Sequence, residues 1–139
     1  MSKAHAATEG LDTLVGDYCA AWSEHDGARR WAMLERVWAA DGTYTDPSAH
    51  VAGRSALDAH IAMTLREALP PGASIVATTH VDAHHGRFRF GWKGVLPDGS
   101  TFLEGTDFGE VDDDGRILRI VGFFGALSSR AGPASAPVS

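Results

Sequence analysis

The sequence predicts a single α+β domain in which three helices pack on one face of a curved antiparallel sheet. Two observations lead to this prediction. Apolar residues recur with helical spacing over residues 11–65, and from residue 73 onward β-prone runs alternate with turn residues. The 139 residues, 44% hydrophobic and 22% charged, fit one domain with one core. We expect this domain to span residues 1–127, and residues 128–139, rich in Ala, Gly, Pro and Ser, to form a disordered tail.

Two helices are expected first. One runs from Leu11 to Trp22 and buries a face that includes Leu14, Val15 and Tyr18. The next follows the break at residues 25–27, with Asp26 as its N-cap and Gly42 near its exit. Its apolar positions are Trp31, Leu34, Val37 and Trp38. Because the link between these helices is short, they must pack closely.

A short strand and a third helix come next. Residues 43–46 are typical of a strand and residues 47–53 of a loop. Ser55 and Asp58 form a start similar to a capping box for a helix that continues through Leu57, Ile61 and Leu65. The Pro and Gly residues at 70–72 end this helix.

Four strands complete the domain, over residues 74–83, 87–96, 101–111 and 116–124. Turn residues at 85–86, 97–99 and 113–115 separate them, so consecutive strands are expected to pair as an antiparallel meander. Charged and aromatic residues alternate over residues 87–93, which predicts a solvent-exposed (wet) face with Arg87, Arg89 and Lys93 and a covered aromatic face. The wet face is a candidate for polar contacts in a dimer.

Composition and missing motifs narrow the function. A net charge of −6 and a pI near 5.5, without a basic stripe, argue against nucleic acid as a partner. The sequence shows no export signal and no apolar run of membrane-spanning length, so we expect a cytoplasmic protein without a membrane partner. Phosphate loops, dinucleotide fingerprints, serine elbows and CxxC pairs are all missing. The single cysteine, Cys19, has no neighbouring base or cation that would activate it.

The histidines do not form a convincing metal site. His80, Asp82 and His84 alternate along an expected strand, with His85 at the turn, but this pattern is more typical of a solvated strand face, and no metal is expected. His50 lies on the loop after residue 46 and could line the mouth of a site there, although a surface histidine is the plainer interpretation.

Three other residues are candidates for chemistry, and each has a plain alternative. Asp46 precedes Pro47 and could simply form an Asx turn. Tyr18 lies on an apolar helix face, where core packing would explain it. Asp107 lies inside a strand and by parity shares a face with Leu103, so it points into the covered side if Leu103 does. A buried carboxyl would have a raised pKa, whereas a solvent-facing or bulge position would not.

Residues 18–61 and 105–125 together resemble the nuclear transport factor two-like superfamily, in its SnoaL-like and ketosteroid-isomerase-like branch. The matching features are a Tyr-containing helix, an alanine-rich second helix, the D-x-T-Y-x-D-P strand, a Gly-Arg helix start and the last two strands. The resemblance covers residues 11–125 and implies a cone-shaped, strongly curved antiparallel sheet around three helices, with a central apolar pocket. Such proteins commonly form homodimers, so a homodimer is expected.

The resemblance also implies a mechanism. In ketosteroid isomerases an aspartate before a proline moves the proton, while a tyrosine and a protonated aspartate bind the oxyanion. By motif these positions are Asp46, Tyr18 and Asp107. We expect apolar walls from Phe90, Trp92 and Phe123.

We therefore expect proton transfer without a cofactor, of the isomerase or cyclase type, on a small hydrophobic carbonyl compound. The alternative is a module that binds an apolar ligand or dimerises without chemistry. Dehydratase and epoxide hydrolase activities are less favoured, the latter because residues 121–124 carry no carboxylate.

Overall fold

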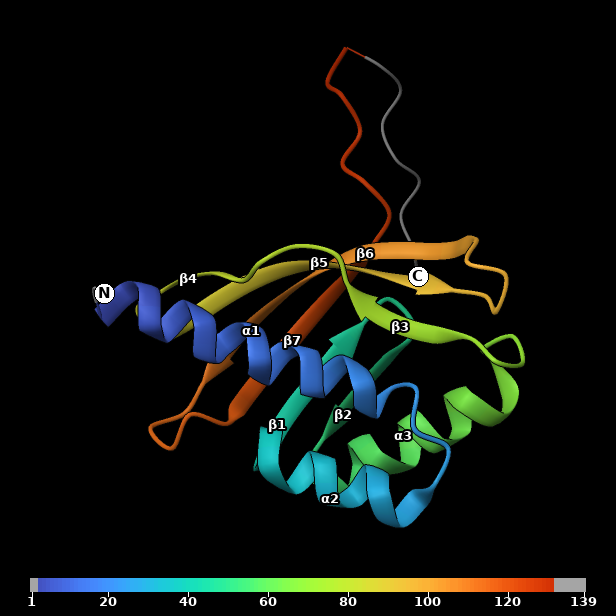
Figure 1. Ribbon diagram of the computed structural model, residues 1–139, viewed down its shortest axis with the longest axis horizontal. Helices are drawn as coiled ribbons and strands as arrows, with labels where there is room; N and C mark the ends of the chain where they lie inside the picture. Colours follow the sequence, from blue (N-terminus) through green and yellow to red (C-terminus); the bar gives the residue numbers. More distant parts are fainter. Residues whose placement is uncertain (1–2, 132–139) are drawn as a thin grey trace.

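The structure is a computed structural model that describes residues 3–131. Three helices and seven strands make up the fold (Figure 1). In chain order they are α1 (Lys3–Ala21), α2 (Gly27–Val37), β1 (Trp38–Asp46), β2 (Ala49–Ala52), α3 (Arg54–Glu67), β3 (Ser74–Ala77), β4 (Asp82–His84), β5 (Arg87–Val95), β6 (Thr101–Val111) and β7 (Ile117–Phe124). The expected tail lies mostly outside the described residues, and residues 128–131 form no helix or strand.

The strands form one mixed sheet in the order β2-β1-β7-β6-β5-β3, with β4 also paired to β5. The expected meander of β5, β6 and β7 is confirmed. The expectation of a wholly antiparallel sheet was wrong at one place, because β1 pairs in parallel with β7. The chain leaves β1 through β2 and α3 before the meander begins, and such a long connection allows β1 to join the last strand in the same direction. The expected strand over residues 74–83 is divided into β3 and β4.

Three local expectations also need correction. Trp38 continues the apolar period of α2, but its backbone is extended and it opens β1. Part of the expected loop after Pro47 is strand β2, which pairs with β1. The expected cap of α3 does not form: Gly53 occupies the N-cap without a side-chain hydrogen bond, and Asp58 pairs with Arg30 instead.

The core lies between the helices and the inner face of the sheet. In Figure 1, α1 runs across the sheet, while α2 and α3 lie beside β1 and β2. The Tyr18 ring stacks on Trp38, with ring centroids 5.5 Å apart. The other fully buried side chains include Leu34, Leu57, Ile61, Ile117 and Ile120. The core therefore joins all three helices to β1 and β7.

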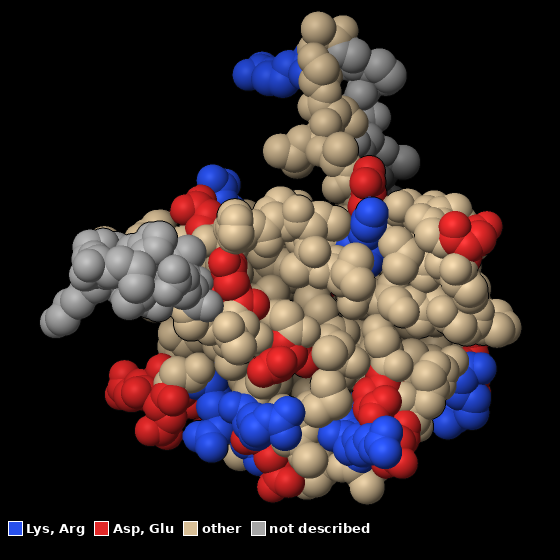
Figure 2. All heavy atoms as spheres, in the orientation of Figure 1, with Lys and Arg blue, Asp and Glu red and all other residues tan. Residues whose placement is uncertain are grey.

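Charged side chains are unevenly spread over the face shown in Figure 2. Lys, Arg, Asp and Glu gather over α2 and α3, and a broad area above them carries few charges. No helix among residues 3–131 is long and apolar enough to cross a membrane.

The buried side chain of Arg30 connects α2 to α3 and to the segment that precedes α2. Arg30 takes a position on the buried face of α2, together with Leu34 and Val37, and is only 6% exposed. Its Nε donates to Asp58 Oδ1 on α3 at 2.7 Å, and Nη1 donates to the carbonyl of Glu24 at 2.8 Å. A buried guanidinium is tolerated there because its donors are matched by these acceptors.

We predict that Arg30→Ala lowers the free energy of unfolding by about 2 to 3 kcal/mol, because it leaves Asp58 and the Glu24 carbonyl without their partner. Urea denaturation would measure this. Arg29→Ala, on the exposed side of the same helix, is the matched control and should change stability by no more than about 0.5 kcal/mol. Equal effects of the two substitutions would contradict a role for the buried pair.

Candidate functional site

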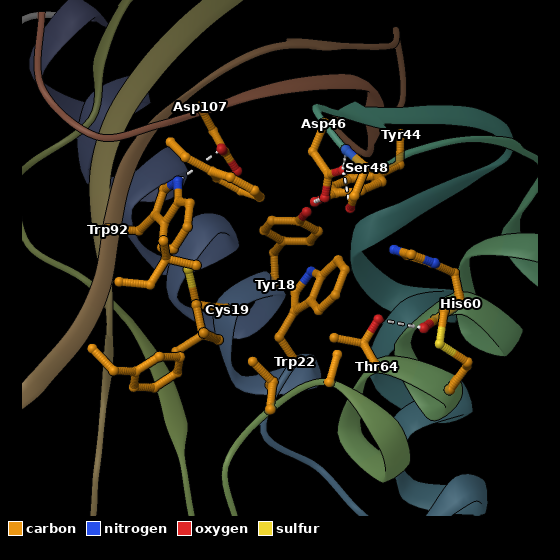
Figure 3. A pocket seen from close by; sticks show the side chains of 17 residues that line it. Tyr18, Cys19, Trp22, Tyr44, Asp46, Ser48, His60, Thr64, Trp92 and Asp107 are labelled. Carbon is orange, nitrogen blue, oxygen red and sulfur yellow. Dashed lines mark hydrogen bonds between the residues drawn. The ribbon is translucent and has the colours of Figure 1, made fainter. Parts of the chain in front are cut away.

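A cavity of about 550 Å³ lies between α1, α3 and the inner face of the sheet (Figure 3). The exposure of the lining side chains distinguishes the end of the cavity that opens to solvent from its closed end. Its mouth is bordered by the exposed residues Ser48, Met63, Ala68 and Phe124. Its floor is formed by the buried residues Tyr18, Cys19, Trp22, Tyr44, Trp92 and Asp107. The volume is in the range of small-molecule sites, and the lining is mainly apolar.

Asp46 enters the cavity from the end of β1 and is held by three donors. The hydroxyl of Tyr44 donates to Asp46 Oδ2 at 2.5 Å. The backbone N–H and hydroxyl of Ser48 donate to Oδ1 at 2.7 and 2.8 Å. The Asx turn, which was the alternative interpretation of Asp46, is therefore present, and Asp46 nevertheless lines the cavity. Burial and the adjacent Asp46 raise the pKa of Tyr44, which keeps its phenol protonated.

Asp107 lies on the floor of the cavity, on the inner face of β6, and is 7% exposed. The indole N–H of Trp92 donates to its Oδ1 at 2.8 Å. Burial raises the pKa of Asp107 to about 7, the charge of Asp46 adds to the increase, and the Trp92 hydrogen bond opposes it. Near neutral pH this group can therefore hold or release a proton.

Two glycines make room for this arrangement. Gly122 on β7 pairs with Asp107, and a Cβ there would lie 2.7 Å from Asp107 Oδ1 and 3.7 Å from Asp46 Cβ. Both acidic side chains thus approach the same point above Gly122. Gly105 lies beneath the Trp92 ring, which a Cβ would meet at 2.6 Å. Gly105 pairs regularly with β5 and β7, so the bulge considered beside Asp107 is not present there.

Tyr18 and Cys19 reach the same floor from α1. Burial raises the pKa of Tyr18 well above its ordinary value, with further contributions from Tyr44 and Asp107, while a hydrogen bond from Trp22 opposes the increase. The phenol is therefore a neutral donor. Burial also raises the pKa of the Cys19 thiol to about 12, with Asp107 contributing. An unreactive thiol of this kind agrees with the low expectation for Cys19 as a nucleophile.

The structure brings together some of the residues expected at the site and separates others. Asp46, Tyr18, Asp107 and Trp92 all line the cavity. Phe90 is buried on the inner face of the sheet but does not reach the lining.

Two residues that were expected at the site do not line the cavity. Phe123 is 54% exposed on the outer face, against Phe108, because Gly122 and Phe124 occupy the inward positions of β7. His50 lies exposed on β2, where Nδ1 contacts Thr45 Oγ1 at 2.7 Å, away from the cavity.

Sequence reasoning missed Tyr44, Ser48 and His60 in the lining. Tyr44 could have been found, since strand alternation places it on the same face as Asp46. His60 flanks the apolar face of α3 one turn after Leu57, and its ring lies 5.7 Å from those of Trp22 and Tyr44. No local pattern distinguishes Ser48 from an ordinary turn residue.

The histidine group near β4 is dispersed among other partners. His80 Nδ1 contacts Asp12 Oδ2 at 2.8 Å, and Asp82 accepts from Arg89 Nε at 2.9 Å. The rings of His84 and His85 contact each other. Within residues 3–131 no group of three His, Cys, Asp or Glu side chains is placed to hold a metal ion.

Comparison with known proteins supports a common fold and family. The family model of the SnoaL-like domain matches residues 15–120. A proposed isomerase of the SnoaL-like family from Agrobacterium tumefaciens has a TM-score of 0.75 and 32% identity, and the match covers 82% of this chain and 96% of that one.

Two more distant solved structures share the fold. A proposed polyketide cyclase from Sinorhizobium meliloti has a TM-score of 0.59 and 22% identity, over 83% of this chain and 97% of that one. A protein from Catenulispora acidiphila with a ketosteroid-isomerase-like fold, solved in complex with trimethylamine, has a TM-score of 0.60 and 18% identity, over 90% and 88%. The comparison with curated protein sequences gave no match.

The raised pKa of Asp107 makes a prediction about stability. The pKa of its carboxyl is near 3.8 in the unfolded chain and about 7 in the fold, so the group ionises more easily in the unfolded chain. The free energy of unfolding should therefore fall as the pH rises from about 4 to 7, by about 4 kcal/mol at most. Urea denaturation of Asp107→Asn should show this decline removed, while Asp41→Asn, an exposed carboxylate on β1, should retain it. The same pH dependence in both variants would refute the assignment.

Proposed function

Because this chain belongs to the SnoaL-like family, within the nuclear transport factor two-like superfamily, we propose that its cavity catalyses proton transfer on a small hydrophobic carbonyl compound. The reaction is of the isomerase or cyclase type and uses no cofactor. The observation that carries this proposal is the meeting of Asp46, Asp107 and Tyr18 in one mainly apolar cavity.

Asp46 is the general base. Its carboxylate takes a proton from the carbon next to the substrate carbonyl, and the electron pair of that C–H bond forms an enolate. In an isomerisation, Asp46 returns the same proton to a different carbon and the double bond moves. Tyr44 and Ser48 touch Asp46 and position it, since their three hydrogen bonds determine how its oxygens face the cavity.

Asp107 and Tyr18 supply the second half of the reaction. An enolate forms only if donors stabilise the oxygen that becomes negative. A base and an oxyanion donor need different environments, and the two acids have them. Asp46 is surrounded by donors, whereas Asp107 is buried with a pKa of about 7. Asp107 in its protonated form and the neutral phenol of Tyr18 therefore act as the donors to the oxyanion.

The second candidate is ligand binding without chemistry. The mainly apolar lining favours it, because a cavity of this composition can retain an apolar ligand without any reacting group. The trimethylamine complex of the Catenulispora protein concerns that protein, and it suggests a small amine as one probe for this chain. Ligand retained in native mass spectrometry, with no turnover over a panel of ketones, would favour binding alone.

We predict that Asp46→Asn slows conversion of a β,γ-unsaturated ketone to its conjugated isomer by at least ~10²-fold, because the amide cannot accept the proton. Absorbance of the conjugated product measures the rate. Asn keeps the size of Asp, so substrate binding should change little and the loss should appear in kcat.

Asp41→Asn is the control for this experiment, since it removes an exposed carboxylate from the same strand and should leave the rate unchanged. Equal rates in wild type and Asp46→Asn would remove Asp46 from the mechanism.

A further inference from the structure

On the basis that this cavity is the ligand site of the proposed function, we infer that it also binds small alkylated ammonium ions, which compete with the carbonyl substrate for the floor around Asp107. These ligands carry a positive charge on a nitrogen covered by methyl or similar groups. Three features of the described residues support this assignment: the charge of the lining, its aromatic rings and one free carboxyl oxygen.

The lining has acidic groups and no strongly basic ones. Asp46 and Asp107 face the cavity, and among the lining residues that the structure describes there is no Lys or Arg. Burial raises the pKa of Asp107 and the charge of Asp46 adds to the increase, so a negative charge on Asp107 is poorly compensated here. A cation between the two groups would supply that compensation.

Aromatic rings surround the same space. Six of them contribute to the lining: Tyr18, Trp22, Tyr44, Trp92, Phe102 and Phe124. The faces of such rings attract cations, and the attraction is stronger where water is excluded. An alkylated ammonium ion suits these walls better than a bare ammonium ion, because its methyl groups are apolar and carry little water.

Asp107 offers an oxygen for the charge. Its Oδ1 accepts from Trp92, whereas no hydrogen bond from the described residues reaches its Oδ2. That oxygen is not sealed in the core, since Asp107 lines the cavity and its Oδ2 is not among the enclosed atoms that lack a partner. Asp46 is less available to a cation, because it already accepts three hydrogen bonds, two at Oδ1 and one at Oδ2, whereas Asp107 accepts one.

The two kinds of ligand need opposite forms of Asp107. The carbonyl oxygen needs the protonated acid, and the ammonium ion needs the carboxylate. With a pKa of about 7, the carboxylate is about a tenth of the population at pH 6, so cation affinity should fall about tenfold from pH 8 to pH 6. The other titratable groups facing this space are Asp46 and Tyr44 on β1, Tyr18 and Cys19 on α1, and His60 on α3.

The test compares choline with 3,3-dimethylbutan-1-ol, which has the same shape but a carbon in place of the charged nitrogen. Calorimetric titration of the full chain at pH 8 should show choline binding at least about tenfold more tightly than the alcohol. The affinity for choline should fall at pH 6, and the affinity for the alcohol should not. Equal affinity for both compounds at pH 8, or no binding of choline, would overturn the inference.

Variants separate the groups involved. In Asp107→Asn the preference for choline over the alcohol should disappear, and in Asp41→Asn it should remain. His60→Gln removes the histidine that also lines the cavity, and the loss of choline affinity at pH 6 should persist in this variant. A preference unaffected by Asp107→Asn, or a pH dependence removed by His60→Gln, would contradict the role of Asp107.

These measurements need no turnover, so they are independent of the proposed isomerisation. If the ketone reacts but choline does not bind, only the cation site fails. If choline binds as expected and Asp46→Asn keeps full activity, only the proton-transfer proposal fails.

Discussion

Two carboxyl groups, those of Asp46 and Asp107, share one mainly apolar cavity, and Gly122 lies between the Asp107 carboxyl and the Cβ of Asp46. Such an arrangement is unfavourable by itself, because burial and like charge both oppose ionisation. The two carboxyl groups coexist because their hydrogen bonding and burial differ. Asp46 receives three hydrogen bonds near the mouth, whereas Asp107 receives one on the floor, where burial raises its pKa.

The sheet is what brings these groups together. The parallel pairing of β1 with β7 sets Asp46 one strand away from Gly122, and the antiparallel pairing of β7 with β6 sets Gly122 opposite Asp107. A side chain at residue 122 would separate them. The helices then close the space: α1 contributes Tyr18 and Cys19 to the floor, and α3 contributes His60 and Met63 to the wall and mouth. The pair formed by the buried Arg30 and the partly exposed Asp58 joins α2 to α3.

The proposed carbonyl substrate and the proposed organic cation both depend on this arrangement. The protonation state of Asp107 decides whether the floor presents a donor or a negative charge, and a pKa of about 7 places that decision near neutral pH. The family alone does not select between these uses, because members of one fold carry different chemistry on different side chains.

The sequence by itself determined what depends on local pattern: three helices from apolar periodicity and the β5–β7 meander from its turns. Strand parity placed Asp107 on the same face as Leu103 but left open which face is the inner one. Family resemblance added Asp46 and Tyr18 to the same site. Tertiary structure decided the rest. The parallel β1–β7 pair and the inward positions of β7 depend on contacts between distant segments, so Phe123 faced outward and Phe124 took its expected place at the cavity. His60 lines the cavity and His50 does not. The residues near either histidine do not indicate this, because it depends on how α3 packs on β1.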